Sequence, residues 1–364
     1  SGTLSSSDLD AGATATWSAP TPNGTYGSIA IDATTGMWTY TLDSSRAATQ
    51  ALAAGQTATE LMVLRVTDEF GASTDQTVTL TINGSNDAPT ISIGSGNSGS
   101  ASLAEVNGNL TTTGSLTVSD VDLINTVSAT VVGVAKAGTT TGLGSNDAAL
   151  LAMLSLTPTA PATVVSNTST TGTLGWAFSS ASEAFNHLAV GENLMLTYTV
   201  RVTDSAGATA DQAITITVNG SNDTPTITAT DVSGAVTEDM TCGCAGTPML
   251  RDSGSIGFGD LDLSDRATAS ASWVSSTASS GASISSALAT ALQAIGTTFS
   301  LTGDGVGGYS ASSSGTVNWS FALENSLSQY LAEGETITVV YRITVSDDNN
   351  IAAAGGGNAV SSSS

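Results

Sequence analysis

Alternation of apolar residues with threonine is the dominant pattern along the chain. It is clearest in Thr77–Ile82 and Ala213–Val218, where every second side chain is apolar. A period of two puts alternate side chains on opposite faces of a strand, so each segment predicts a strand with one buried face. Clusters of Asp, Asn and Gly separate these segments at turn-like spacing. Helical periodicity is confined to Asp147–Leu156 and Ile284–Ile295, which predict two short helices.

The strand pattern occurs three times in register. In each copy a strand ends in an aspartate, a glycine stands 13 residues before it, and a leucine stands three residues before the glycine. A tryptophan and a second aromatic residue lie further upstream, two positions apart. The anchors of the three copies are Trp38, Tyr40, Leu52, Gly55 and Asp68; Trp176, Phe178, Leu188, Gly191 and Asp204; and Trp319, Phe321, Leu331, Gly334 and Asp347. Such agreement identifies internal repeats.

The repeats divide the chain into domains of residues 1–88, 89–224 and 225–364, separated by Asn-Asp-x-Pro linkers. We expect an all-β chain of tandem immunoglobulin-like β-sandwiches, with the two short helices inserted in the second and third domains. The first domain aligns from strand B onward, so strand A is missing. In the third domain, Gly355–Gly357 stands where the last strand is expected, so that strand is atypical or missing.

Composition narrows the classes of function. The chain has 31 acidic and 7 basic residues, for a formal net charge of −24. Nucleic acids and anionic membranes need clustered Lys and Arg, so neither is expected as a partner. The balance suits hard divalent cations. No apolar run is long enough to cross a bilayer and no signal peptide begins the chain, so we expect a mature chain or one excised from a longer protein.

The sequence lacks the combinations of residues that catalytic sites need. His187 is the single histidine, and we interpret it as a surface or packing residue. The serines lack a partnered base, and the recurring tryptophans are expected in the core. The sequence therefore predicts a protein that is not an enzyme.

Cys242 and Cys244 are the two cysteines of the chain. They are too few for a disulfide framework or a zinc site. They can pair locally or link to another chain, and the sequence leaves both alternatives open.

The segment Gly24–Pro89 resembles a VCBS repeat of bacterial surface proteins. The resemblance is carried by Trp38–Asp43, Ala51–Gly55 and Val66–Gly71, together with the Asn-Asp-x-Pro linker. The other two copies are similar to the cadherin-like modules found beside such repeats. The resemblance implies a large secreted adhesin of the RTX-adhesin type, often exported by type I secretion, with calcium between its modules.

Acidic residues are expected to meet where the first two domains join. In a seven-strand sandwich the B–C and F–G loops face the preceding domain, whereas the A–B and E–F loops face the following one. Asp120 and Asp122 lie in the B–C loop of the second domain, and Asp204 opens its F–G turn. The linker residues Asn86 and Asp87 arrive at the same end, so a Ca²⁺ site is predicted there.

The second junction is expected to be richer in ligands. Two glutamates come from the second domain, two residues from the linker and three aspartates from the third domain: Glu105, Glu192, Asn222, Asp223, Asp260, Asp262 and Asp347. This distribution is similar to that of cadherin junctions, although the linker lacks their second Asn. Gln56 replaces a glutamate at the first junction, so fewer or weaker ions are expected there. The alternative for each residue is that it simply caps a turn.

These features predict a secreted or cell-surface structural and adhesive repeat region of a bacterial protein, for cell adhesion or a biofilm matrix. Calcium would stiffen the junctions, because an ion that binds only the docked arrangement stabilises it. The expected partners are neighbouring repeats of the same or identical chains, and a cell-surface or matrix receptor. The alternative is a self-assembling subunit of an extracellular filament or sheath.

Overall fold

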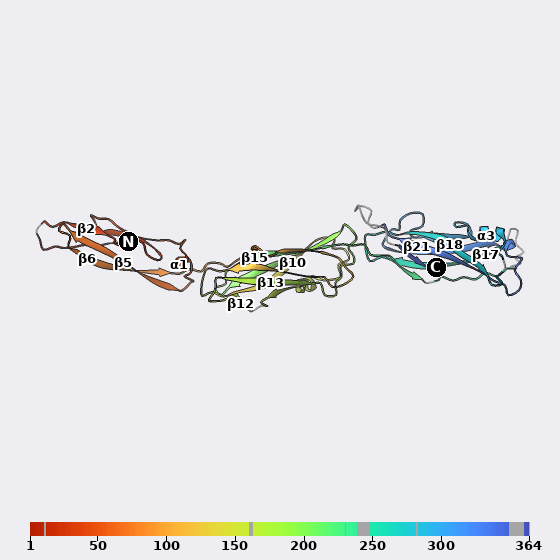
Figure 1. Cartoon of the computed structure of the whole chain (residues 1–364), viewed down its shortest axis with the longest axis horizontal. Helices are drawn as coiled ribbons and strands as arrows, with labels where there is room; N and C mark the ends of the chain where they lie inside the picture. The colour runs from red at the N-terminus through yellow and green to blue at the C-terminus, as the bar shows by residue number, and fades with distance from the viewer. Residues whose placement is uncertain are drawn as a thin grey trace.

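The computed structural model describes residues 1–10, 12–159, 163–229, 231–238, 248–281, 283–348 and 360–363. Three β-sandwich modules follow one another in a line (Figure 1). The predicted all-β fold of tandem sandwiches is therefore confirmed. Cys242, Cys244 and Gly355–Gly357 lie outside the described residues, and the predictions made for them remain predictions.

The second module is built from two sheets, ordered β12-β10-β14-β15-β8 and β11-β13-β9-β7. Its elements are β7 (Thr90–Ser92), β8 (Ser100–Ala104), β9 (Thr111–Ser119), β10 (Val127–Gly138), α2 (Asp147–Ala152), β11 (Leu154–Thr157), β12 (Thr163–Val165), β13 (Thr171–Ser179), β14 (Asn193–Asp204) and β15 (Thr209–Asn219). Alternation explains the core: Leu194, Leu196 and Tyr198 point inward on β14, while Met195 between them is exposed. The inward faces of both sheets form one continuous apolar cluster.

The first module is thinner, with sheets ordered β1-β4-β3 and β2-β5-β6. Its elements are β1 (Gly2–Thr3), β2 (Ala15–Ser18), β3 (Gly27–Ile31), β4 (Met37–Leu42), α1 (Ala47–Gln50), β5 (Thr57–Asp68) and β6 (Ser73–Asn83). None of its described strands occupies the positions of β7 and β8 in the second module. Its core is correspondingly small, with Ile29, Met62 and Leu64 at the centre.

The third module has sheets ordered β16-β17-β20-β19 and β18-β21-β22. Its elements are β16 (Thr226–Ala229), β17 (Met249–Gly259), β18 (Thr268–Ala278), α3 (Ser286–Leu292), β19 (Phe299–Gly303), β20 (Ser314–Glu324), a 3₁₀ turn (Asn325–Leu327), β21 (Ile337–Ser346) and β22 (Val360–Ser363). The short strand β22 pairs with β21 at the position of the last strand. Both predicted helical segments contain helices, α2 and α3, each shorter than the segment that predicted it.

A glycine faces a tryptophan across two neighbouring strands in every module. Gly2 pairs with Trp38, Gly114 with Trp176 and Gly254 with Trp319. A Cβ atom on Gly114 would lie 2.3 Å from Cζ2 of Trp176, so the indole covers the glycine and no side chain fits beneath it. The indole N–H of Trp176 donates to the Ser98 carbonyl at 2.7 Å, and thereby ties the opening segment of the module to its core.

A tyrosine ties each inserted helix to its sandwich. The hydroxyl of Tyr198 on β14 donates to the carbonyl of Leu150 in α2 at 2.9 Å. In the same way Tyr341 on β21 donates to the carbonyl of Leu292 in α3 at 2.7 Å. The first module lacks the insertion and carries Met62 at the equivalent position of β5. The tyrosine therefore accompanies the insertion.

Replacing Tyr198 by phenylalanine will destabilise the second module by about 1–2 kcal/mol, because the buried Leu150 carbonyl loses its donor. Chemical unfolding followed by tryptophan fluorescence measures this difference. Tyr309→Phe is the matched control, because the Tyr309 ring is 49% exposed. Equal stability of Tyr198→Phe and the native chain would show that the hydrogen bond does not stabilise the fold.

Candidate cation-binding junctions

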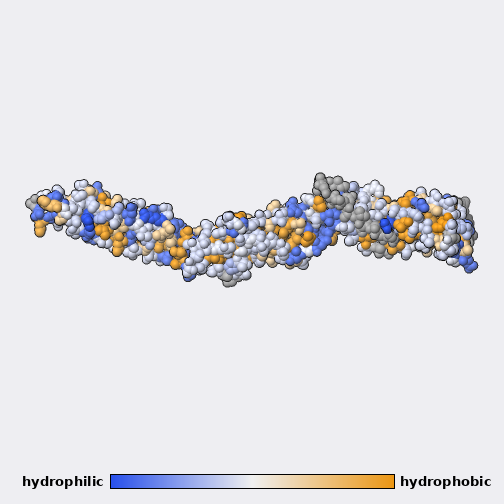
Figure 2. Space-filling model, viewed as in Figure 1, coloured by the Kyte–Doolittle hydropathy of each residue, from blue (hydrophilic) through white to orange (hydrophobic). Residues whose placement is uncertain are grey.

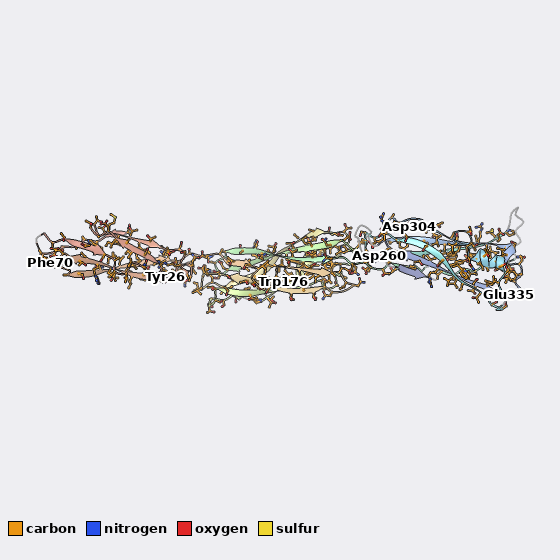
Figure 3. The ribbon with its side chains drawn as sticks, turned by 45° about the horizontal axis from the view of Figure 1, so that its top comes forward. Tyr26, Phe70, Trp176, Asp260, Asp304 and Glu335 are labelled. Atoms are coloured by element: carbon orange, nitrogen blue, oxygen red, sulfur yellow. The ribbon has the colours of Figure 1, made fainter. Side chains whose placement is uncertain are left out.

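The loops named from the sequence lie at the module ends. Figure 3 places Asp260 where the second and third modules meet, and Phe70 and Glu335 at opposite ends of the molecule. Phe70 belongs to the turn between β5 and β6, and Glu335 to the loop before β21. The F–G turns thus point toward the N-terminal end and the E–F loops toward the C-terminal end, as predicted. Figure 2 shows hydrophilic residues gathered on the visible face at the second junction.

Each linker passes tightly over the E–F loop of its own module. A Cβ atom on Gly84 would lie 2.3 Å from the carbonyl oxygens of Leu52 and Ala53. On Gly220 it would lie 2.2 Å from the equivalent oxygens in the second module. Only glycine leaves room for this approach. The Asn-Gly step therefore fixes where the following Asn-Asp pair enters the junction.

At the first junction the linker is hydrogen-bonded to both acidic loops of the second module. The Asn86 amide donates to Oδ2 of Asp204 at 2.9 Å, and the Asp87 N–H donates to Oδ2 of Asp122 at 2.9 Å. Oδ1 of Asp120 accepts from the Asp122 N–H at 3.0 Å. All five residues predicted for this junction are thus brought together.

Asp204 combines a turn cap with a position at the junction. Its Oδ1 accepts the N–H groups of Ala206 and Ala208 at 2.9 and 2.8 Å. Gly207 completes the turn with φ of 95°, a conformation that glycine adopts readily. The other oxygen, Oδ2, faces Asn86. The turn cap and the junction position are therefore compatible for the same side chain.

The second junction repeats these contacts. The Asn222 amide donates to Oδ2 of Asp347 at 3.1 Å, and the Asp223 N–H donates to Oδ2 of Asp262 at 2.7 Å. Oδ1 of Asp260 accepts from the Asp262 N–H at 3.0 Å. Two different stretches of sequence thus build the same docking pattern.

The second module adds two glutamates to the second junction. Glu105 is buried and accepts from the Ser221 hydroxyl next to the linker. Glu192 accepts from the Ala189 N–H at 3.1 Å, and its charge helps to raise the pKa of Asp265 in the third module. At the first junction Gln56 makes the equivalent bond to the Ala53 N–H at 3.0 Å, so the turn is kept but the charge is not.

Several buried carboxylate oxygens have no hydrogen-bond partner among the described residues. At the first junction these are Oδ2 of Asp120 and Oδ1 of Asp122. At the second they are Asp223 Oδ2, Asp260 Oδ2, Asp262 Oδ1 and both oxygens of Asp265. A buried charged oxygen without a donor or a cation is costly.

The pKa values of the aspartates at the second junction reflect their burial and their closeness to one another. Burial, followed by neighbouring carboxylates, raises the pKa of Asp262 to about 8 and that of Asp265 to about 7. The pKa of Asp260 rises to about 6 for the same reasons. At the first junction burial also raises the pKa values of Asp120 and Asp122. The metal-free sites therefore hold protons more tightly than free carboxylates do.

Five further polar residues belong to these junctions and were not predicted. Asn125 and Ser205 lie at the first junction, and Asp265 and Asp348 take the equivalent places at the second. The signal was present as the repeated spacing Asp-x-Asp-x-x-Asn/Asp, in which Asn125 and Asp265 follow the second aspartate by three residues. Asn107, whose amide donates to Oδ1 of Asp223 at 2.9 Å, was also missed.

The first module carries the same Asp-x-Asp turn at its outer end. The Asp10 N–H donates to Oδ1 of Asp8 at 2.9 Å, as in the two junction loops. Both side chains are exposed here, since no linker lies over them among the described residues. The turn therefore forms without a docked linker.

The second junction also has a direct contact between modules. A Cβ atom on Gly142 would lie 2.3 Å from Cδ1 of Leu263 and 2.9 Å from Cβ of His187. Leu263 of the third module thus packs against the second module, beside the buried His187. Apolar packing and acidic residues meet at the same junction.

In the arrangement of the described side chains, no three His, Cys, Asp or Glu residues converge closely enough to hold a metal ion by themselves. A site would therefore need the carboxylates to move together, with amide and carbonyl oxygens completing the shell. Within the described part of the chain, no helix has the length and apolar character needed to cross a membrane.

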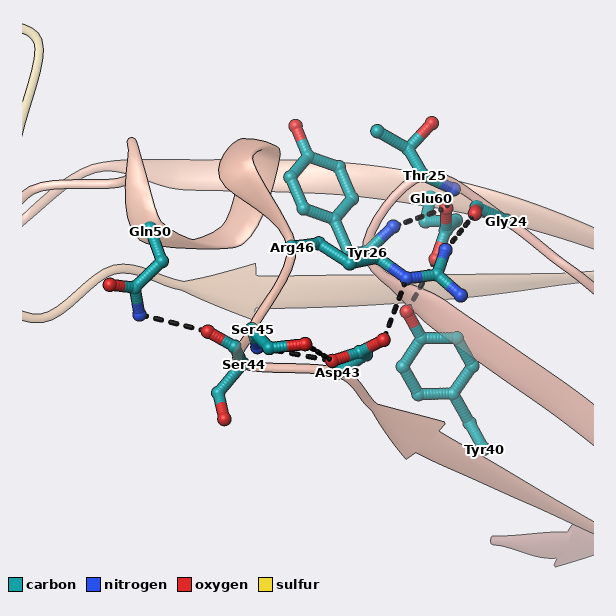
Figure 4. Close-up of polar contacts among 10 residues, drawn as sticks. All are labelled: Gly24, Thr25, Tyr26, Tyr40, Asp43, Ser44, Ser45, Arg46, Gln50 and Glu60. Carbon is teal, nitrogen blue, oxygen red and sulfur yellow. Dashed lines mark hydrogen bonds and ion pairs between the residues drawn. The ribbon is translucent and has the colours of Figure 1, made fainter. Parts of the chain in front are cut away.

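A separate polar cluster in the first module surrounds the buried Glu60 (Figure 4). Its Oε1 accepts the N–H groups of Thr25 and Tyr26, and its Oε2 accepts the Tyr40 hydroxyl. Burial and Glu60 together raise the pKa of Tyr40. Arg46 donates to the carbonyl of Gly24 beside this cluster. Both Glu60 oxygens therefore have donors, and neither is unpaired. The bond from Tyr40 also links β4 to β5.

No family model matches the chain, and no curated protein matches it by sequence. Among solved structures it is similar to the protocadherin γB4 extracellular domain at 14% identity and a TM-score of 0.40, covering 96% of this chain and 42% of that one. It is also similar to mouse protocadherin-24 EC1–3 at 16% identity and a TM-score of 0.34, covering 98% and 89% of the two chains. For human CDH23 EC21–23 the identity is 14%, the TM-score 0.37 and the coverage 97% and 88%. The chain spans less than half the length of the first of these.

Proposed function

We propose that the chain is an extracellular structural and adhesive repeat region whose modules are held in line by calcium at the two junctions. The observation that carries the proposal is the set of buried carboxylate oxygens without partners at both junctions. They come from loops of the following module and from the linker that docks on them. A divalent cation would neutralise these charges and supply the missing interactions.

The proposed ligands at the first junction are Asn86, Asp87, Asp120, Asp122 and Asp204. Those at the second are Glu105, Glu192, Asn222, Asp223, Asp260, Asp262 and Asp347. Calcium fits better than magnesium, because it accepts about 6–8 oxygens in flexible geometry, whereas magnesium needs near-ideal octahedral sites. Loops from two modules supply that kind of irregular shell.

Binding would convert a hinge into a rigid joint. Asn86 and Asn222 reach the acidic loops only when their linkers are docked, so the complete ligand set exists only in that arrangement. A ligand that binds one arrangement shifts the population toward it. The linear order of modules in Figure 1 is the arrangement that calcium would select.

The proposal places the protein in the secreted or cell-surface class of bacterial adhesins that its repeats resemble. Its partners would be neighbouring repeats of the same or identical chains, and a cell-surface or matrix receptor. No catalytic activity is proposed. The alternative, a self-assembling filament subunit, predicts large assemblies of the pure protein.

Small-angle scattering of the whole chain in millimolar calcium and in excess chelator tests the proposal. Calcium will lengthen and narrow the particle, with binding in the range of about 10⁻⁴–10⁻³ M that is usual for extracellular modules. Replacing Asp262 by asparagine will weaken the effect, because it removes a fully buried carboxylate of the second junction. Asp8→Asn is the matched control, because it removes the same charge from an exposed turn.

A scattering profile that is the same with calcium and with chelator would contradict the calcium proposal, and the acidic residues would then be turn caps. Large particles in both solutions would instead favour the filament alternative. Calcium-dependent lengthening that persists in Asp8→Asn and is weakened in Asp262→Asn supports rigid junctions.

A further inference from the structure

Besides the glutamates of the second module, the two junctions differ at one pair of equivalent positions beside the linker. Three residues after the second aspartate of the B–C loop stands Asn125 at the first junction and Asp265 at the second. Directly after the aspartate of the F–G turn stands Ser205 at the first and Asp348 at the second. The hydrogen bonds that dock the linker on the two acidic loops are the same at both junctions, so this pair is a chemical difference within a shared docking pattern.

At the first junction the pair is neutral and hydrogen-bonded. The Asn125 amide donates to Oδ1 of Asn86 at 2.8 Å and to Oδ2 of Asp122 at 3.2 Å. Its Oδ1 accepts from the Ser205 hydroxyl at 3.2 Å. The two amide hydrogens thus join the linker to the B–C loop. These hydrogen bonds hold the linker against the B–C loop, as a cation bound between the same oxygens would.

At the second junction the same place holds carboxylates. Asp265 is 1% exposed, and neither of its oxygens has a hydrogen-bond partner among the described residues. A carboxylate cannot donate, so it cannot replace the amide of Asn125. Oδ1 of the neighbouring Asp262, which is fully buried, is also without a partner in the described part of the chain.

Asp348 lies beside Asp265 and is only partly neutralised. Its Oδ1 accepts the Arg266 N–H at 2.9 Å, which places the carboxylate next to residue 265. Its Oδ2 lies 3.6 Å from Nε of Arg266, a side chain that is 54% exposed, so the ion pair is weak. Among the charges that raise the pKa of Asp265, that of Asp348 has the largest effect.

We propose that the carboxylates of Asp265, Asp348 and Asp262 draw together around an additional divalent cation at the second junction, in the place where the first junction uses the Asn125 amide. In the present arrangement of the described side chains they do not yet converge closely enough to hold an ion by themselves, so amide and carbonyl oxygens would complete the shell. The inference rests on the proposed function and adds to it. Hard carboxylate oxygens select calcium or a similar cation. The second junction consequently takes up one more ion than the docking contacts it shares with the first junction require, and its rigidity depends more strongly on the cation.

Exchange of the two pairs tests this site. In one variant Asp265→Asn and Asp348→Ser give the second junction the side chains of the first. In the other, Asn125→Asp and Ser205→Asp do the reverse. Bound calcium per chain is measured by equilibrium dialysis and metal analysis of the whole, chelator-stripped protein. The first variant will bind one calcium fewer than the native chain, and the second will bind one more or bind more tightly at the first junction.

Unfolding in chelator is the second measurement. There Asp265→Asn with Asp348→Ser will be at least as stable as the native chain, because the exchange removes buried charge and restores an amide donor. A loss of calcium therefore cannot be attributed to misfolding. Native protein that binds calcium with the same stoichiometry and affinity as both variants overturns the additional site alone. Native protein that binds no calcium overturns the proposed function itself.

Discussion

In chelator, the third module will unfold at a lower temperature at about pH 8 than at about pH 5, by on the order of 10 °C. The cause is the raised pKa of Asp262, about 8, and of Asp265, about 7. A carboxyl whose pKa is higher in the folded state than in the unfolded chain contributes stability at low pH, and this contribution is lost as the pH rises through the folded pKa. Between the ordinary aspartate pKa of 3.8 and these raised values, the unfolded chain has released protons that the folded state still holds.

Thermal unfolding followed by circular dichroism across this pH range measures the slope. Asp262→Asn will flatten it, since the variant lacks the group with the highest pKa of the cluster, whereas the exposed Asp8→Asn will leave it unchanged. Saturating calcium will remove or reverse it, because the ion binds deprotonated carboxylates. A metal-free protein that is as stable at about pH 8 as at about pH 5 would show that these carboxylates relax into solvent.

Replacing Gly114 by valine will destabilise the second module by roughly 2–4 kcal/mol. The first added carbon already lies 2.3 Å from Cζ2 of Trp176, whose side chain is buried in the core. Either the indole leaves its place, with loss of buried area and of its bond to Ser98, or strand β9 moves away from β13. Denaturant unfolding monitored by tryptophan fluorescence measures the loss.

Gly133→Ala is the matched control within the same module. No heavy atom lies within 4 Å of the position its Cβ would take, so stability will change by less than about 0.5 kcal/mol. A double variant with Gly114→Val and Trp176→Leu will lose less than the sum of the two single changes, because the smaller side chain relieves the collision. Additive losses would mean that the two residues do not oppose each other in the core.

The sequence was sufficient for the fold because the repeats constrain one another. Period-two alternation located strands such as β6 and β15, and the repeated aspartate at the end of the preceding strand located the turn before each of them. The parallel pairing of β8 with β15 was not predicted. Its segment, Ser100–Ala104, is made of small residues, and its apolar signal is too weak to distinguish a strand from a loop.

Most of the site residues that were predicted from the sequence are acidic and lie in loops at the same end of a sandwich. Acidic residues in loops that share one end of a sandwich had to converge, and the linker contacts of Asp122 and Asp262 show this convergence. Asn125 was missed because an asparagine in a loop is most simply explained as a turn residue. Asp265 was missed because its burial depends on how the third module packs, which local sequence does not determine. Whether these residues bind calcium stays a prediction.

The parallel pairing of β8 with β15 has a mechanical consequence. The chain enters the second module at β7 and continues into β8, while β15 leads directly into the exit linker at Gly220. Tension along the molecule would therefore pull the two strands in opposite directions along their own axes. All the ladder hydrogen bonds from Ser100 to Ala104 would share the load and would have to break together, rather than one after another.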